Sequence, residues 1–204
     1  MNRRQLKGQE TKKRILNTAL NLFAKKGFHN VTVDEIVQQS SSSKGAFYNH
    51  FKSKHEIFHS KFEEIDQFYV SFVESQQIPV ENSIYQQLLD FFEFQMTYIQ
   101  KELGHDLIRT IYENELTPER ESFFGNPDRP FYQILNTYFM EGQQRGEFRT
   151  DIEAPYMTRC IARAIRGLLY DWAIFNHSVD IVEESQKYLR YCLDGFSSKL
   201  DRTI

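Results

Sequence analysis

Two histidines four residues apart are the first candidates for chemistry in this sequence. They lie in the stretch KSKHEIFHSKF, residues 52–62, at His55 and His59. On a helix, an H-E-x-x-H pattern can place two zinc ligands beside a catalytic glutamate, as in zinc hydrolases. The extended form of the pattern needs glycine and histidine farther along, where this chain has Phe62 and Ile65. A zinc hydrolase is therefore kept only as an alternative, and we expect no metal and no cofactor.

Glu56, the glutamate of that pattern, has a simpler structural explanation. Ser53 and Glu56 have the spacing of a capping box, in which a glutamate accepts a hydrogen bond from a free backbone N–H at the start of a helix. We predict that Glu56 reaches back to the N–H of Ser53. His55 and His59 are then an exposed or half-exposed pair on one face of a long helix.

A second group of polar residues is suited to reading nucleic acid. In SSKGAFYNHF, residues 42–51, Phe47 and Phe51 are spaced to face inward. The opposite face then presents groups for base edges, since asparagine can pair with adenine, lysine can donate to guanine, and an alanine methyl can meet a thymine methyl. The predicted base-reading residues are Ser43, Lys44, Ala46 and Asn49.

Four further residues are predicted to contact phosphates, which set affinity and register without reading sequence. Tyr48, His50 and Lys54 flank the base-reading face, and the hydroxyl of Thr32 stands at the start of the preceding helix. The charge distribution agrees: residues 1–54 carry a formal charge of +8, and the remaining 150 residues carry −11. This asymmetry indicates a polyanionic partner at one end, with a basic solvated face as the alternative.

The elements that position these residues are predicted to be helices throughout. Apolar residues recur at helical spacing, and no convincing alternating run indicates a strand. Three short helices followed by a long one outline a helix-turn-helix unit, which predicts a DNA-binding domain over 1–52 and a helical domain over 53–204. The predicted helices cover about 10–26, 33–39, 44–51, a long segment opening at 53, 82–102, 105–115, 129–145, 154–176 and 180–198.

The stretch VTVDEIVQQSSSSKGAFYNHFKSKHEIF resembles the DNA-binding segment of TetR-family (tetracycline-repressor-like) transcriptional regulators. The resemblance is dense over about residues 10–60, and farther on EGQQRGEFRTDIE and GLLYDWAIF resemble the last three helices of that family. It implies an all-helical homodimer with a C-terminal effector pocket, two-helix dimerisation, and phosphate contacts by Tyr48, His50 and Lys54. The matching residues are Thr32, Ile36, Ser43-Lys44-Gly45, Phe47-Tyr48-Asn49-His50-Phe51 and Lys52-Ser53-Lys54.

The turn between the two short helices departs from the family pattern. It usually carries glycine and then an aliphatic residue, and this chain has Ser41 and Ser42. Ser41 would have to adopt a turn conformation that is less comfortable without glycine. Ser42 gives up a small apolar anchor between the helices. A degenerate relative that does not bind DNA is the alternative.

The C-terminal part is rich in aromatic residues, which collectively predict a cavity for an apolar or aromatic effector. Ordinary core packing is the alternative for each of them, and the sequence leaves open whether Arg109, Arg163 or Arg166 points inward. The predicted lining residues are Phe62, Tyr69, Phe72, Phe94, Tyr98, Tyr112, Phe139 and Trp172.

The last two predicted helices carry apolar stripes with small residues that permit close helix approach. A half-site reader needs a twofold partner to hold a palindrome, so these stripes are predicted to form a dimer bundle, with intramolecular core as the alternative. The predicted interface residues are Ile161, Ile165, Leu168, Leu189, Leu193 and Phe196.

Composition excludes several other classes. The mean hydropathy is −0.57, and no run of about 18 apolar residues could span a membrane. The basic first 14 residues are not followed by an apolar segment, so secretion is not expected. Cys160 and Cys192, the only cysteines, suit a reducing cytoplasm and are predicted to be buried, with a redox pair as the alternative.

Together with the resemblance, these residues predict a cytoplasmic repressor that binds a palindromic operator as a homodimer. A small, largely apolar or aromatic effector is expected to release it from DNA. A zinc hydrolase and a DNA-binding protein without a ligand remain the alternatives.

Overall fold

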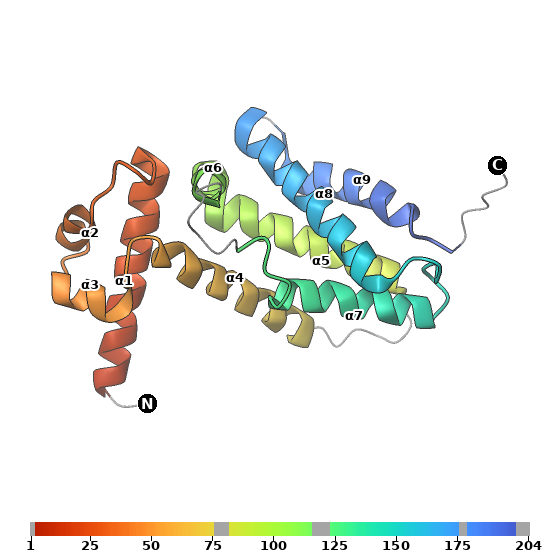
Figure 1. The fold of residues 1–204 in the computed structure, drawn as a ribbon, viewed down its shortest axis with the longest axis horizontal. Helices are drawn as coiled ribbons and strands as arrows, with labels where there is room; N and C mark the ends of the chain where they lie inside the picture. The colour runs from red at the N-terminus through yellow and green to blue at the C-terminus, as the bar shows by residue number, and fades with distance from the viewer. Residues whose placement is uncertain (1–2, 76–81, 116–122, 176–178, 199–204) are drawn as a thin grey trace. The chain divides into compact units, whose positions relative to one another are not determined.

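The computed structural model describes residues 3–75, 82–115, 123–175 and 179–198 and is built from helices (Figure 1). The predicted all-α fold is confirmed, and the extended pairing in these ranges is an isolated antiparallel bridge between Phe148 and Ser197. None of the helices there is long and apolar enough to cross a membrane. The elements are α1 (Arg3–Lys26), α2 (Val33–Gln39), α3 (Lys44–His50), α4 (Glu56–Ser75), α5 (Ile84–Tyr98), η1 (Ile99–Leu103), α6 (Gly104–Glu115), α7 (Pro130–Gln144), α8 (Ala154–Phe175) and α9 (Ile181–Asp194).

Backbone contacts divide the chain into two units. The head unit comprises Met1–Ile65 and Asp106–Phe124, and the body unit comprises Asp66–His105 and Gly125–Ile204. This division differs from the predicted boundary after residue 52, because most of α6 belongs with the N-terminal helices. The Thr110 hydroxyl of α6 donates to the Phe23 carbonyl of α1 at 3.4 Å.

The helix limits agree closely with the predicted ones, with two informative differences. α1 begins at Arg3 rather than near residue 10, because its first turns are solvated and carry no apolar periodicity to reveal them. The segment predicted as one helix over 82–102 is α-helical only to Tyr98 and is followed by one π-helical turn, Ile99–Leu103. Gly104 follows with φ 72°, a left-handed conformation that favours glycine.

In the head unit, α1, α2 and α3 pack on one another (Figure 1), and their facing sides form a buried apolar cluster. Ile36 of α2 and Phe47 of α3 are fully buried, and Ile15 and Phe23 of α1 lie in the same core. The aromatic ring of Phe23 packs against Phe58 at the start of α4, with 5.2 Å between ring centres. This core fixes α3 to the other helices by its inner face alone.

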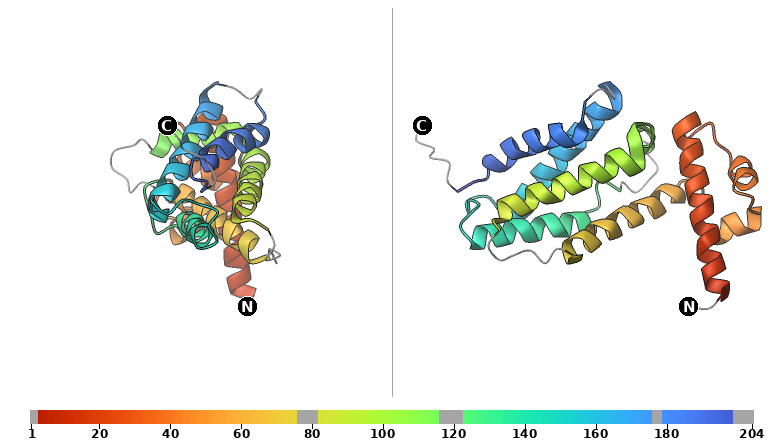
Figure 2. Two further views of the ribbon diagram at one scale, coloured as in Figure 1. Left: turned by 90° about the vertical axis from the view of Figure 1, so that its right-hand side faces the viewer. Right: turned by 180° about the vertical axis from the view of Figure 1, so that it is seen from behind.

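In the body unit, four helices form a closed ring of contacts. α5 packs on α7 and α9, and α8 packs on the same two helices, so each has two neighbours (Figure 2). Glu147, in the loop between α7 and α8, accepts hydrogen bonds from the backbone N–H groups of Ile84 and Tyr85 at 3.0 and 3.1 Å. A carboxylate at this position satisfies free donors at the start of α5 and complements its dipole.

Gly142 of α7 lets the α7–α8 loop fold back tightly. A Cβ atom placed there would lie 2.3 Å from the ring of Phe148 and 3.3 Å from Ile84. Phe148 is buried against Phe139, with 5.2 Å between ring centres. A Cβ at this position would collide with the ring, so glycine permits the close approach.

Four of the six predicted dimer-interface residues are buried within this single chain. These are Ile161, Ile165, Leu189 and Leu193, and they are buried because the apolar stripes of α8 and α9 pack against their own neighbours. Phe196 packs on Phe139 at 5.8 Å between ring centres, and Leu168 is half-buried. The alternative of intramolecular core describes the four buried residues, while Leu168 and Phe196 are partly accessible.

Candidate functional sites

Each of the two short helices is capped at its start by a hydroxyl side chain. The Thr32 hydroxyl accepts a hydrogen bond from the N–H of Glu35, and the Ser43 hydroxyl accepts one from the N–H of Ala46, each at 3.1 Å. Such caps contribute about 1 kcal/mol each and set where a helix begins. The carboxylate of Glu35, three residues after Thr32, pairs with Lys26. Both hydroxyls predicted to contact DNA therefore already accept a hydrogen bond within the head unit.

The turn between these helices is a Schellman motif built without glycine. Ser41 has φ 49°, and its N–H donates to the carbonyl of Gln38, while the N–H of Ser42 donates to the carbonyl of Val37. The motif normally carries an apolar contact between the residues that Ser42 and Val37 occupy. The turn geometry thus forms in this chain, with Ser41 in the strained conformation that the sequence predicted.

We expect Ser41→Gly to raise the free energy of unfolding by about 0.5–1 kcal/mol. The left-handed conformation costs a residue with a Cβ about 1–2 kcal/mol, part of which the added freedom of glycine in the unfolded chain cancels. Urea denaturation followed by circular dichroism measures the change. Ser42→Gly, where φ is not positive, is the matched control and should lower stability. Equal losses from both variants would contradict the strain at Ser41.

The turn is also held from α1. The side chain of Arg14 donates to the carbonyl of Ser40 at 2.8 Å, which caps the end of α2. Lys12 lies 5.8 Å from the centre of the Phe51 ring. These basic residues of α1 were not singled out by the sequence, since a charged residue in a basic helix carries no local sign of a distant partner.

The outer face of α3 presents several of the predicted DNA-binding residues to solvent. Lys44, Tyr48 and Asn49 are exposed, with Tyr48 55% accessible, while Ala46 and His50 are half-buried. Phe47, between them in sequence, is fully buried. The structure therefore brings the predicted base-reading and phosphate-binding groups of α3 onto one accessible surface.

Lys44 meets an acidic neighbour on this surface. Its ammonium lies 2.7 Å from the Asp34 carboxylate of α2, and both side chains are mostly exposed. The hydrogen bond to Asp34 raises the pKa of Lys44 above its ordinary value. Because exposed ion pairs are weak and screened by salt, a DNA phosphate or base can compete for this lysine. Asp34 was not recognised from the sequence as part of the site.

Lys54 is placed differently from the prediction. Its ammonium donates to the backbone carbonyls of Phe28 at 2.8 Å and Val31 at 2.9 Å, and it lies 4.4 Å from the centre of the Phe28 ring. Burial lowers the pKa of Lys54. Since an ammonium has three N–H donors, two are engaged inside the head unit. Lys54 thus anchors the loop between α1 and α2, and one N–H at most is left for the predicted phosphate contact.

We expect Lys54→Ala to destabilise the head unit by about 1–2 kcal/mol, because two carbonyls lose a charged donor. Chemical denaturation measures this loss, and Lys52→Ala, at an exposed neighbour, should change stability by less than about 0.5 kcal/mol. Weakened DNA binding with unchanged stability would instead show that Lys54 acts as a phosphate contact.

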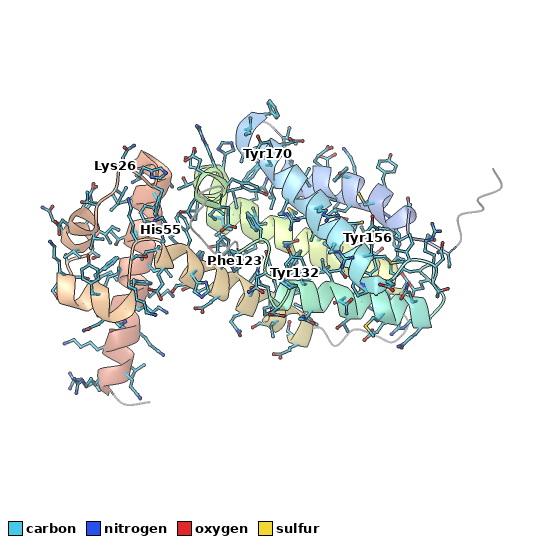
Figure 3. All side chains as sticks on the ribbon, viewed as in Figure 1. Lys26, His55, Phe123, Tyr132, Tyr156 and Tyr170 are labelled. Atoms are coloured by element: carbon cyan, nitrogen blue, oxygen red, sulfur yellow. The ribbon has the colours of Figure 1, made fainter. Side chains whose placement is uncertain are left out.

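The histidines of the H-E-x-x-H pattern have separate partners. His55 (labelled in Figure 3) pairs with Asn114 at 3.2 Å, and its ring centre lies 4.5 Å from that of Phe28, while His59 pairs with Glu63 at 3.4 Å. The Glu56 carboxylate accepts a hydrogen bond from the backbone N–H of Lys52 rather than from the predicted Ser53. Among the residues that the structure describes, no three His, Cys, Asp or Glu side chains gather as a metal site.

The predicted effector-pocket residues fall into several separate groups. Phe62 stacks on Phe123, and Tyr112 packs on Phe124, all within the head unit. Phe139 lies with Phe148, and Trp172 lies against His105. One body cluster joins α4 to α5 through ring contacts of 3.8–6.1 Å between centres. It contains the remaining four predicted residues, Tyr69, Phe72, Phe94 and Tyr98, together with Phe68 and Phe91.

Next to Tyr69 in the body unit lies a buried ion pair. Arg129 donates to both carboxylate oxygens of Asp66 at 2.9 Å, and the two side chains are 10% and 7% accessible. Of the three arginines left open by the sequence, Arg109 and Arg163 are exposed. Arg166 is half-buried and donates to the Tyr132 hydroxyl at 2.8 Å. The innermost arginine, Arg129, was not anticipated.

The outer surfaces of α8 and α9 carry exposed and half-buried residues, which on α8 repeat at alternating spacings of four and three. Both free cysteines are half-buried on these helices, and burial raises the pKa of the Cys192 thiol. A raised pKa disfavours the reactive thiolate, so it does not support a redox pair. This surface, called the outer stripe below, contains Tyr156, Cys160, Arg163, Gly167, Tyr170 and Ile174 on α8 and Tyr188 and Tyr191 on α9, with Tyr156 and Tyr170 labelled in Figure 3.

Comparisons with known proteins cover both parts of the chain. Residues 15–60 match the family model described as bacterial regulatory proteins, tetR family. An uncharacterized HTH-type transcriptional regulator, YerO of Bacillus subtilis (strain 168), is 58% identical over 45 residues, which are 22% of this chain and 16% of YerO. UidR of Escherichia coli (strain K12), an HTH-type transcriptional regulator, is 24% identical over 179 residues, covering 84% of this chain and 86% of UidR.

Solved structures share the fold along most of the chain. A SmeT–triclosan complex has a TM-score of 0.76 at 15% identity and covers 94% of this chain and 93% of its own. Thermus thermophilus FadR, a TetR-family repressor in complex with lauroyl-CoA, has a TM-score of 0.67 at 21% identity, covering 95% and 97%.

A tight turn that presents the outer face of a short second helix, over a basic N-terminal unit, defines a helix-turn-helix DNA-binding protein. The helical body that follows and the match over residues 15–60 indicate which group of helix-turn-helix proteins this is. Residues 15–60 have the DNA-binding domain of TetR-family transcriptional regulators, and the chain as a whole shares their fold. Members of this family are DNA-binding regulators and not enzymes, which sets the zinc-hydrolase alternative aside.

Proposed function

We propose that the protein is a ligand-responsive repressor that binds a palindromic operator as a homodimer. The observation that carries the proposal is the accessible outer face of α3, where Asn49 and Lys44 project from a helix fixed by the buried Phe47. Asparagine and lysine are side chains that can distinguish bases in the major groove. Tyr48 and His50 flank them and supply contacts to phosphates.

A single head reads one half-site, so a palindrome requires two. Two recognition helices reach successive major grooves when they stand about 34–36 Å apart, one helical turn of DNA. We assign the pairing surface to the outer stripe of α8 and α9. Its exposed tyrosines and Ile174 are large apolar groups that a second copy would cover, and Gly167 permits close helix approach. Their three-and-four spacing suits packing in a bundle of helices.

The effector response is proposed for the body unit. SmeT with triclosan and FadR with lauroyl-CoA have this fold and bind small molecules. The aromatic cluster between α4 and α5 offers apolar surface for such a molecule. An effector releases DNA only in so far as it binds better to a conformation whose heads are wrongly spaced.

The decisive experiment is selection of bound duplexes from a random DNA pool by the purified full chain. Enrichment of an inverted repeat whose half-sites are one or more helical turns apart would support the palindrome and the dimer together. Binding that depends steeply on salt but enriches no sequence would contradict sequence-specific repression.

We expect Asn49→Ala to relax preference at one base position of each half-site, where discrimination should fall by about 1–3 kcal/mol. Competition between the selected duplex and duplexes changed at single positions measures this effect. Tyr48→Phe is the matched control and should weaken binding to all duplexes alike, because it removes a phosphate contact. If Asn49→Ala weakened every duplex equally, the proposed orientation of α3 in the groove would be wrong.

A further inference from the structure

Gln95, in the last turn of α5, has a buried polar end that the protein does not satisfy. The side chain is 4% accessible, and its amide nitrogen donates to the Tyr69 hydroxyl at 3.1 Å. Its oxygen is fully buried and has no hydrogen-bond partner among the described residues. If the amide were turned over, the nitrogen would be left over instead. In either orientation, one polar atom of Gln95 faces the interior without a partner.

A second unsatisfied group lies nearby on α7. Tyr138 is 6% accessible, and its hydroxyl also has no hydrogen-bond partner within the described residues. Its ring centre is 6.3 Å from that of Phe91, which in turn is 5.6 Å from Tyr69. Gln95 follows Phe91 by one turn of α5. Both unsatisfied groups therefore adjoin the same phenylalanine in the body unit.

Buried polar groups left unpaired are costly, so native proteins normally satisfy them with protein, water or ligand atoms. Two such groups in one aromatic region suggest a partner that is absent when the chain is alone. The rings around them are Tyr69, Phe91 and Phe131, with 5.6 and 6.1 Å between the centre of Tyr69 and those of the other two. Flat apolar surfaces of this kind favour an aromatic partner.

The charges of this region favour an uncharged partner. Asp66 and Arg129 neutralise each other through two hydrogen bonds, so neither is free to hold an ion. Tyrosine hydroxyls are neutral near pH 7, and burial raises the pKa of Tyr69 and of Tyr138 further. An anion placed here would be desolvated without gaining a free cation.

We propose that the body unit binds an uncharged aromatic molecule whose hydroxyl or amide group hydrogen-bonds to Gln95 and Tyr138. This inference rests on the proposed effector response for its biological meaning, but binding itself can be tested without DNA. A hydroxyl or an amide can both donate and accept, so it suits either orientation of the Gln95 amide.

Three probes of one shape separate the possible chemistries: 2-naphthol, naphthalene and 2-naphthoate. Calorimetric titration of the full chain should give an affinity for 2-naphthol about tenfold or more above those of the other two, as expected for a buried hydrogen bond gained without a charge. Gln95→Leu and Tyr138→Phe should each reduce 2-naphthol toward the affinity of naphthalene and leave naphthalene binding unchanged. Gln86→Leu, at an exposed site on the same helix, is the control and should change none of the three.

Three results would overturn the inference. These are equal affinities or no binding for all three probes, a preference for 2-naphthoate, or unchanged 2-naphthol binding in both site variants. The last result would mean that buried water already satisfies the two groups.

The effector response is tested separately by adding the probes to the complex with its selected duplex. Selective 2-naphthol binding that never releases DNA would leave the site assignment standing and contradict the proposed response. Release of DNA by other molecules, with no discrimination among the probes, would support the effector response and contradict the site assignment.

Discussion

Arg129→Met is expected to lower the free energy of unfolding by about 3–5 kcal/mol. The substitution removes the guanidinium that holds both oxygens of Asp66 and leaves a carboxylate buried in an apolar region. Breaking a buried pair on one side costs this much because the remaining charge has lost both water and partner. Urea denaturation at fixed protein concentration measures the change.

The matched control removes the stranded charge. Adding Asp66→Asn to Arg129→Met should recover most of the lost stability, since an amide is far less costly to bury than an isolated carboxylate. A loss below about 1 kcal/mol in the single variant would place Asp66 and Arg129 among weak, solvated pairs. It would also remove the reason for expecting an uncharged ligand.

Gly142→Val is expected to destabilise the body unit by about 3 kcal/mol. A Cβ atom at this position overlaps the buried ring of Phe148 and approaches Ile84. Overpacking of a full core costs about 1–3 kcal/mol, and the small gain in helix propensity from replacing glycine cannot offset it. Denaturation measured by circular dichroism tests the value.

Gly8→Val is the comparison for this substitution. Gly8 is also helical, but no heavy atom lies within 4 Å of an added Cβ there, so its effect should stay within about 0.5 kcal/mol. Equal losses at the two positions would mean that Phe148 moves aside easily. In that case close packing would not explain the glycine.

The helix-turn-helix segment was predicted well because its signals are local. Thr32 and Ser43 stand directly before the helices that they cap, and Phe47 and Phe51 repeat at one helical turn. A serine in the place of glycine likewise predicted the strain that Ser41 shows. Each of these inferences needed only residues within a few positions of one another.

The contacts that the sequence did not reveal join residues far apart in the chain. Lys54 was predicted to contact a phosphate, and its neighbouring residues carried no sign of its carbonyl partners 23 and 26 residues earlier. Asp66 and Arg129 are 63 residues apart, and no pattern in either neighbourhood indicates the pair. The Glu147 carboxylate, which accepts hydrogen bonds at the start of α5, is likewise 63 residues from Ile84 in the sequence.

The apolar stripes of α8 and α9 show a different limit. Periodicity identified Ile161 and Leu189 as facing an apolar environment, but it cannot say whether the same chain or a second copy provides it. The structure answers that the same chain does. The outer stripe escaped notice because tyrosine, cysteine and glycine do not form an obvious hydrophobic run.

The place of α6 within the head unit bears on how such regulators can be recombined. A head made of residues 1–65 alone would leave the buried faces of Thr110, Ile111 and Asn114 without a counterpart. A chimera that exchanges DNA specificity by a single cut near residue 52 or 65 would therefore join helices that were never fitted to one another. A working graft should also carry the second segment, residues 106–124. The head is thus one compact unit that is encoded by two separate stretches of the sequence.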